Sequence, residues 1–310
     1  MKRDILKSNF NKRKALPFLQ PTAYSLQPAY QRNVGRRRFC KNKVGLCALG
    51  IILFLTLVAA ATLILSWLGL PWPMSPNTTD LSQKLLPPSQ LHWLGTDHLG
   101  RDVFSRMLHG APISLTVGFT TVSVSLSIGV AIGSIAGYCG GKIDQFLMRL
   151  VDAFLCFPTF FLILTAVALL GPSLINIVVV IGLVSWTGTA RLVRGEFLTL
   201  REAEYVQAAR ILGQDSLKII IRHILPNAAA VILITAVLGI PEAILAEAGL
   251  SFLGFGVQPP QATWGNIIAD GKTYLLEAWW LILFPGFAIF ITALAFYLVG
   301  DSLREAGEKK

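Results

Sequence analysis

Charged residues are scarce in this chain, and that scarcity decides its class. Only 14% of the 310 residues are charged, whereas 54% are hydrophobic, and the mean hydropathy is +0.61. A soluble globular domain usually carries about a quarter charged residues. The composition therefore excludes an ordinary soluble protein and predicts an integral membrane protein.

Cysteine is also rare, which argues against a disulfide scaffold and against a thiolate metal site. The chain has four cysteines, Cys40, Cys47, Cys139 and Cys156, and their spacing resembles no ligand set. Three of them lie in or beside apolar runs and the fourth lies in a basic tail. We expect no disulfide bond.

Six apolar runs, most of them without an ionisable residue, predict an all-α polytopic protein with six transmembrane helices. A run of about 20 residues crosses a hydrocarbon core of ~30 Å. The predicted spans are Val44–Trp67, Ile113–Tyr138, Ala153–Leu170, Leu174–Ala190, Asn227–Ala246 and Ala278–Gly300.

A carrier driven by its own proton or sodium coupling usually places ionisable groups deep in its spans. Here Asp152 lies at the inner end of the third span, and Glu242 and Glu247 lie towards the outer end of the fifth. The two glutamates are candidates for the substrate path, although hydrogen bonding at the rim of the bundle is the commoner role. We therefore expect the energy source to be elsewhere, with a stand-alone channel or ion-coupled carrier as the alternative.

A phosphate-binding loop is missing as well. The segment Gly271-Lys272-Thr273 resembles the end of such a loop, but the required earlier glycine is replaced by Asn266. No nucleophile and base share a span. We expect no catalytic residue, no cofactor bound by this chain, and no enzymatic activity of its own.

Histidines are few, and three of them fall in the first outer loop. His92, His98 and His109 lie near Asp97 and Asp102, which are ligand types for a metal ion. Neither helical nor hairpin spacing relates them. We expect them to make hydrogen bonds and expect no metal site.

Basic residues are distributed on one side of the predicted spans, which fixes the orientation. With the N-terminus inside, the inner segments hold 23 of the 27 Lys and Arg residues and the outer loops hold four. Positive residues mark the cytoplasmic side. The predicted inner segments are a basic, disordered arm (1–43), two loops (139–152 and 191–226) and a tail (302–310). We expect the arm to lie near anionic lipid rather than nucleic acid. An extracytoplasmic loop is predicted at 68–111.

The cytoplasmic stretch Tyr205–Asn227 interrupts the apolar chain with two short predicted helices around Gly213. Asp215 or Ser216 is placed to cap the second helix, and Pro226 is placed to stop it. The second helix carries an apolar stripe with no partner inside the chain: Leu217, Ile220, Ile221 and Ile224. We predict a docking surface for a cytoplasmic protein.

The same stretch matches a family motif that reads Glu-Ala-Ala, three residues, Gly, nine residues, Ile-x-Leu-Pro. Ala208, Ala209, Gly213 and Leu225-Pro226 fit it, whereas Gln207 replaces the glutamate and His223 the isoleucine. Further matches are His92–Asp97, Gly100–Arg106, Ala246–Gly254, Gly256–Pro260 and Trp264-Gly265. Over residues 44–301 the chain resembles the integral-membrane permease of an ABC importer, in the dipeptide, oligopeptide and nickel branch.

The resemblance implies a type I importer fold, with the transmembrane domain at 112–301, in a bacterial inner membrane. It implies a second permease, usually non-identical, an extracytoplasmic binding protein, and two cytoplasmic ATPases that hydrolyse ATP. The substrate would be a dipeptide, an oligopeptide or a small solute such as nickel. The implied ATPase-docking residues are Tyr205, Val206, Gln207, Ala208, Ala209, Gly213, Leu217, Ile221, Leu225 and Pro226.

Overall fold

The computed structural model describes residues 38–70, 72 and 74–307, so most of the predicted basic arm lies outside the described residues. All of the regular structure in this part of the chain is helical. The helices are α3 (Lys43–Trp67), α4 (Val103–Cys139), α5 (Gly141–Leu155), α6 (Thr159–Leu170), α7 (Leu174–Leu200), α8 (Glu204–Ile211), α9 (Ser216–Ile219), the π-helical turn η2 (Ile220–Ile224), α10 (Leu225–Phe252), α11 (Trp264–Gly271) and α12 (Trp280–Gly307), with 3₁₀ turns η1 (Leu81–Gln83) and η3 (Lys272–Tyr274).

Among the described residues, five helices are long and apolar enough to cross a membrane, namely α3, α4, α7, the continuous α9–α10 helix and α12. A sixth span exists if the pair α5–α6 counts as one, and this pair is bent by 78° at its break. The third predicted span was a single kinked helix over Ala153–Leu170. The structure has a sharp break there because Pro158 lacks an N–H group and disfavours a helical conformation at Phe157.

Several helices extend beyond the predicted apolar runs. Helix α4 begins at Val103, where Asp102 caps it by accepting a hydrogen bond of 2.7 Å from the Ser105 N–H group. Helix α7 continues to Leu200, and α12 continues to Gly307. Hydropathy locates the membrane-embedded part of a helix, whereas its polar turns continue into the aqueous phase and carry no apolar signal.

Pro226 does not stop the second cytoplasmic helix, so that prediction was wrong. Residues Ser216–Phe252 form one helix of 37 residues, and Pro226 lies in the first turn of α10, directly after the π-helical turn. The helix continues past the proline because the preceding turn is π-helical, with the Leu225 N–H group donating to the Ile220 carbonyl, and local π-helical adjustments of this kind accommodate a residue without an N–H group. The cytoplasmic helix therefore runs directly into the fifth span.

Helices α4 and α7 form the centre of the bundle and approach each other through glycines. A Cβ atom on Gly129, Gly133 or Gly137 of α4 would lie 2.5–2.6 Å from atoms of α7. Close backbone approach of this kind is the main source of helix association in lipid, where burial of apolar surface supplies no driving force. In addition, Arg194 of α7 makes a bidentate ion pair with Asp144 of α5.

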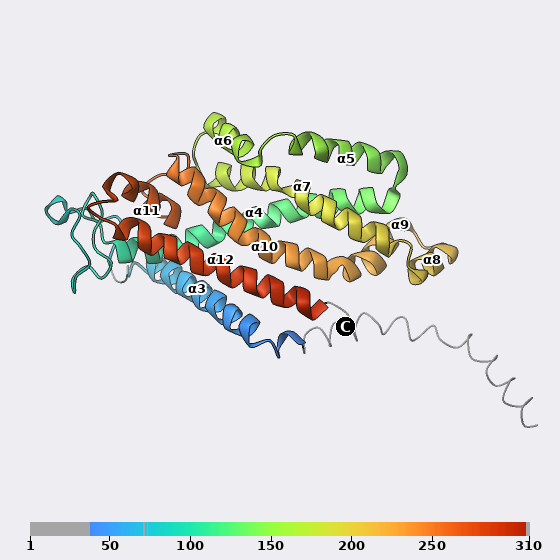
Figure 1. Cartoon of the computed structure of the whole chain (residues 1–310), viewed down its shortest axis with the longest axis horizontal. Coiled ribbons are helices and arrows are strands. Elements are labelled where there is room, and N and C mark those ends of the chain that lie inside the picture. The colour runs from blue at the N-terminus through green and yellow to red at the C-terminus, as the bar shows by residue number, and fades with distance from the viewer. Residues whose placement is uncertain (1–37, 71, 73, 308–310) are drawn as a thin grey trace, which may run out of the picture.

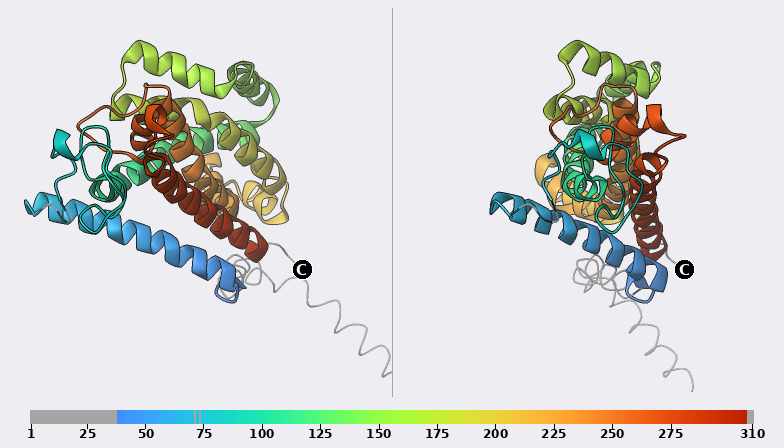
Figure 2. Two further views of the ribbon diagram at one scale, coloured as in Figure 1. Left: turned by 60° about the vertical axis from the view of Figure 1, so that its left-hand side comes forward. Right: turned by 90° about the vertical axis from the view of Figure 1, so that its left-hand side faces the viewer.

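The helical bundle is elongated and has two distinct ends (Figure 1). Helices α8 and α9 lie at one end, whereas α11 and the loop after α3 lie at the other. Helix α3 lies at the edge of the bundle and contacts α12, and Figure 2 shows the start of α3 beside the end of α12. The charge distribution assigns the α8–α9 end to the cytoplasm, and we call the opposite end the outer end.

Candidate functional site

The turn between α8 and α9 depends on Gly213, as the sequence predicts. Gly213 has φ of +73°, and the backbone N–H groups of Gly213 and Gln214 donate to the carbonyls of Arg210 and Ala209 at 2.9 and 3.1 Å. This left-handed helix end favours glycine. No atom of the described residues lies within 4 Å of the position that a Gly213 Cβ would take, so the backbone conformation is the reason for the glycine.

One face of the helix pair is buried in the chain itself. Val206 and Ala209 of α8 pack with Ile219 and Ile224 against Phe197 of α7. Two of the predicted docking residues, Val206 and Ala209, therefore have a structural role. Tyr205, Gln207 and Leu225 are half-buried, whereas Ala208, Gly213, Leu217, Ile221 and Pro226 are exposed.

The opposite face carries exposed large apolar side chains on both sides of the turn. Ile211 and Leu212 end α8 with 86% and 79% of their surface exposed, and Leu217 and Ile221 are 63% and 56% exposed. We call these four residues the cytoplasmic patch. The predicted stripe divides: Leu217 and Ile221 join the patch, but Ile224 is buried and Ile220 half-buried. Ile211 and Leu212 were missed because they precede the second helix.

Gln207, which departs from the family motif, has its own hydrogen bonds. Its Nε2 donates to the Arg201 carbonyl at 3.2 Å and to Glu202 Oε2 at 3.3 Å. Arg201 in turn donates from Nη1 to the Gly137 carbonyl of α4 at 3.0 Å. The amide therefore connects α8 to the end of α7 through bonds that a glutamate at 207 is unable to donate.

His223, the second departure, also has a hydrogen-bond partner. Its Nε2 lies 3.0 Å from Gln214 Oε1, and the Asn227 amide donates to the His223 carbonyl at 2.6 Å. These bonds connect the turn between the helices to the π-helical turn. Asp215 occupies the N-cap position of α9 without a side-chain capping bond.

Tyr205 has a buried hydroxyl with no hydrogen-bond partner among the described residues. Burial raises the pKa of Tyr205, and the nearby Glu196 carboxylate raises this pKa further. Both effects disfavour the phenolate. The ring packs beside Val206 and Leu225 at the buried base of the helix pair.

Glu242 and Glu247, the candidates for the substrate path, lie in different environments. Glu242 is exposed on the flank of α10. Glu247 is 1% exposed, and its Oε1 accepts hydrogen bonds from Ser251 Oγ at 2.7 Å and Thr263 Oγ1 at 3.0 Å. Of these two glutamates, only Glu242 has a side chain that a solute at the surface of this subunit is able to reach.

Two of the three outer histidines make hydrogen bonds as predicted, but the prediction was wrong for His98. The buried Nδ1 of His98 has no hydrogen-bond partner among the described residues, and its ring stacks on Tyr274 with the ring centroids 5.8 Å apart. His92 Nδ1 lies 3.0 Å from Asp102 Oδ1, and its Nε2 lies 2.6 Å from Gln83 Oε1. His109 Nδ1 donates to the Ser105 carbonyl at 2.9 Å. The His92 contact joins the loop to Asp102, the N-cap residue of α4, whereas the His109 bond lies within α4 itself.

A second outer cluster joins the loop to α11 through two arginines. Asp97, His98 and Asp270 have ligand-type atoms within 4.8 Å of one another. However, both carboxylates bind guanidinium groups: Arg101 contacts Asp97 at 2.6 Å and Asp270 at 3.1 Å, and Arg106 contacts the same carboxylates at 3.4 and 3.3 Å. The two arginines already balance the two negative charges.

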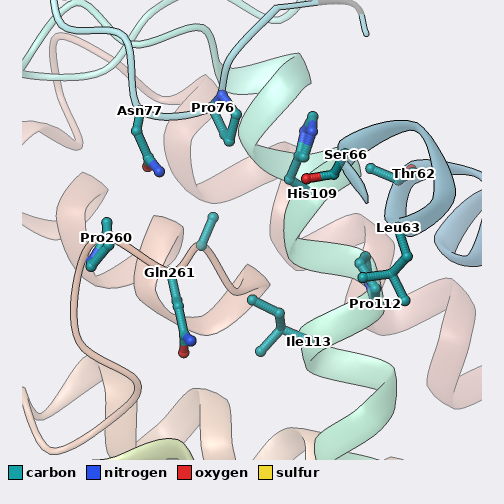
Figure 3. A pocket seen from close by; sticks show the side chains of 11 residues that line it. Thr62, Leu63, Ser66, Pro76, Asn77, His109, Pro112, Ile113, Pro260 and Gln261 are labelled. Carbon is teal, nitrogen blue, oxygen red and sulfur yellow. The ribbon is translucent and has the colours of Figure 1, made fainter. Parts of the chain in front are cut away.

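A shallow hollow also lies at the outer end, between α3, α4 and the loop before α11 (Figure 3). His109 and Ser66 lie on one side of it, with Asn77 and Gln261 across the opening. The rest of the lining is mainly apolar: Thr62, Leu63, Pro76, Pro112, Ile113, Pro260 and Ala262. The hollow is remote from the cytoplasmic patch.

Two family models match the chain. "Binding-protein-dependent transport system inner membrane component" matches residues 129–310, and "N-terminal TM domain of oligopeptide transport permease C" matches residues 31–88. The first match alone covers more than half of the chain.

Similar proteins of comparable length cover most of the chain. A putative peptide transport system permease of Brucella suis is 44% identical over 259 residues, covering 83% of this chain and 85% of its own. The dipeptide permease DppC of Bacillus subtilis is 41% identical over 275 residues, covering 88% and 84%. The oligopeptide permease OppC of Haemophilus influenzae is 36% identical over 279 residues, covering 89% and 87%.

Among solved structures, the inward-facing MetNI methionine ABC transporter has a chain with the same fold. Its TM-score is 0.54 at 17% identity, and the match covers 65% of this chain and 96% of that chain. The fold is therefore that of the membrane-spanning part of an ABC importer.

The chain belongs to the family of binding-protein-dependent transport system inner membrane components, in the group that contains the OppC and DppC permeases. It is a multi-pass permease subunit of the inner membrane and not itself an ATPase. A subunit of this class works with an ATPase and a substrate-binding protein. The predicted family, helical class and location are confirmed.

Proposed function

We propose that this subunit and a second, non-identical permease form the membrane pathway for importing dipeptides or oligopeptides. The support is the agreement among relatives: those that are 36–44% identical over more than four-fifths of the chain are named as peptide, dipeptide or oligopeptide permeases. Exposed phenylalanines on and between α5 and α6 are candidates for contact with the second permease: Phe146, Phe157 and Phe161 are each at least 61% exposed. Glu242 is the candidate side chain for the substrate path.

The observation that carries the energetic part of this proposal is the cytoplasmic patch. Four exposed apolar side chains gathered on both sides of one turn at an aqueous end indicate a docking surface, because full burial of one such side chain contributes about 1.5–3 kcal/mol. We assign this patch to the ATPase. Two ATPases serve the permease pair, and each binds one helix pair.

The mechanism follows from the continuity of α9 with α10. When ATP closes the two ATPases, the patch moves with them, and the unbroken helix Ser216–Phe252 transmits the motion into the fifth span. Access to the pathway then changes from the inside to the outside. We expect the chain to bind no cofactor and to supply no catalytic residue to this cycle.

Association with the ATPase tests the assignment of the patch. Leu217→Asp and Ile221→Asp place a charge in the predicted contact, and we expect ATPase co-purification to fall by at least tenfold, with the permease still inserted. Leu91→Asp, at a residue 73% exposed at the outer end, is the matched control and retains the ATPase. Gly213→Pro removes the turn and has the same expected effect as Leu217→Asp. Normal association of all three cytoplasmic variants would refute the docking assignment.

A further inference from the structure

The outer end of α10 is fixed to α11 at both ends of that short helix. At the start of α11, Thr263 Oγ1 donates to Glu247 Oε1 at 3.0 Å. Just beyond the end of α11, Lys272 Nζ donates at 3.1 Å to the carbonyl of Phe252, which is the last residue of α10. Helix α11 therefore follows the last two turns of α10.

Glu247 is the buried member of this connection. It is 1% exposed, its Oε1 accepts from both Thr263 and Ser251, and its Oε2 has no partner among the described residues. Thr263 is itself fully buried and caps α11, because its hydroxyl accepts from the Asn266 N–H group at 3.0 Å. A single hydroxyl thus links the first turn of α11 to the carboxyl group of α10.

Gly265 allows the carboxyl group to lie directly against α11. A Cβ at this position would be 2.7 Å from Ala248 Cα and 2.9 Å from Glu247 Oε2. The contact is therefore one of backbone on backbone, and no flexible side chain separates the two helices. Because closely packed segments are nearly incompressible, a displacement of α10 would also displace α11.

The other face of α11 contacts α4. The Trp264 N–H group donates to Ser114 Oγ at 3.1 Å, and the Trp264 indole donates to the Met107 carbonyl at 3.2 Å. At the far end, Asp270 pairs with Arg101 and Arg106. Helix α11 consequently bridges the fifth span and the start of the second at the outer end.

The helix that carries Glu247 also carries the cytoplasmic patch residues Leu217 and Ile221. Residues Ser216–Phe252 run without a break for 37 residues, or roughly 55 Å at ~1.5 Å per residue. The ends of this one helix are thus the docking surface at the inner end and the Glu247 contact at the outer end.

We propose that Glu247 is a positioning residue that couples the ATPase-driven motion of α10 to α11, and thereby to opening and closing of the pathway at the outer end. This inference rests on the proposed function. The Glu247 carboxyl group holds Thr263 and Ser251 as a hydrogen-bond acceptor, and its negative charge is not needed for these contacts. The Glu247 side chain acts through α11 and does not contact the transported solute.

The test uses the assembled transporter, in which peptide uptake and ATP hydrolysis are measured together. Glu247→Gln keeps the acceptor for both hydroxyls, and we expect the number of peptides transported per ATP to stay within twofold of the wild type. Glu247→Ala removes the acceptor, and we expect this ratio to fall at least tenfold while the assembled complex still hydrolyses ATP. Glu277→Ala, at an exposed glutamate of the outer end, is the matched control.

The ratio separates coupling from stability, because misfolding removes uptake and hydrolysis together and leaves their ratio unchanged. An unchanged ratio in Glu247→Ala would overturn the proposal, and so would an equal loss in Glu247→Gln. A wild-type complex without ATP-dependent peptide uptake would instead refute the proposed function.

Hydrogen exchange of the α11 amides, residues 264–271, tests the contact independently of transport. We expect exchange in the purified permease to become at least tenfold faster in Glu247→Ala and to remain unchanged in Glu247→Gln. Equal protection in both variants and the wild type would show that Glu247 does not hold α11.

Discussion

Gln207 donates a hydrogen bond to the backbone carbonyl of Arg201, with Nε2 and the carbonyl oxygen 3.2 Å apart. The same amide lies 3.3 Å from Glu202 Oε2. Where the family motif has a glutamate, this chain has a donor facing two acceptors. The departure from the motif therefore matches the local chemistry of this chain.

Restoring the motif glutamate is expected to weaken the cytoplasmic helix pair. Gln207→Glu replaces the donor by a carboxylate that faces the Glu202 carboxylate, and we expect a loss of about 1 kcal/mol in the stability of α8. Amide hydrogen exchange over Glu204–Ile211 measures the change. The double variant Gln207→Glu, Glu202→Gln moves the donor to position 202. It is expected to recover the part of the loss that comes from the contact between residues 202 and 207, but not the part from the bond to the Arg201 carbonyl. If the single variant protected α8 better than the wild type, the hydrogen-bond account would be wrong.

The sequence predicts this region well where a local rule applies. Gly213 was predicted at the turn because a left-handed helix end favours glycine, and it has φ of +73°. The buried face of α8 was not predicted, because Val206 and Ala209 pack against Phe197 of α7 and periodicity alone does not show which neighbour covers a face. For the same reason Ile224 was assigned to the exposed stripe although it is buried.

The glycines between α4 and α7 provide a prediction with a matched control. A Cβ at Gly133 would lie 2.6 Å from the Ala190 carbonyl oxygen, so Gly133→Ala forces the helices apart and is expected to cost about 1–3 kcal/mol. Gly195 of α7 has no atom within 4 Å of its Cβ position. Gly195→Ala is expected to stabilise the helix by about 0.5–1 kcal/mol. Thermal unfolding in detergent ranks the two variants, and the reverse order would contradict the packing described here.

The outer ion-pair cluster predicts a strong effect of losing one carboxylate. Asp97 is 1% exposed and contacts both Arg101 and Arg106. Asp97→Asn leaves two buried guanidinium groups with one remaining carboxylate, which is expected to cost about 3 kcal/mol or more. The unfolding temperature in detergent measures the loss, and Asp301→Asn, at an exposed aspartate, serves as the control. A loss below 1 kcal/mol would show that the cluster contributes little.

This cluster also marks a limit of sequence reasoning. The outer-loop histidines and aspartates were predicted to make hydrogen bonds. The contacts of His92 and His109 agree with that prediction, whereas the buried Nδ1 of His98 has no partner among the described residues. Their partners across the chain were not predictable. Asp270 lies more than 160 positions from Arg101 and Arg106, and no local spacing relates them.

The buried hydroxyl of Tyr205 leads to a prediction of the opposite sign. Because this hydroxyl has no partner among the described residues, Tyr205→Phe removes a desolvated polar group and is expected to leave stability unchanged or raise it by about 1 kcal/mol. Thermal unfolding and ATPase co-purification are the measurements. Loss of ATPase binding in Tyr205→Phe would assign the hydroxyl a contact with the partner.

The proposed role in ATP-driven peptide import is tested most directly by measuring the uptake of a labelled dipeptide into liposomes. The liposomes contain this permease, its partner permease and the ATPases, with the binding protein outside. The account predicts accumulation that requires both ATP and the binding protein, and that falls at least tenfold with Leu217→Asp but not with Leu91→Asp. Accumulation at the same rate without ATP, or without the ATPase subunits, would contradict it.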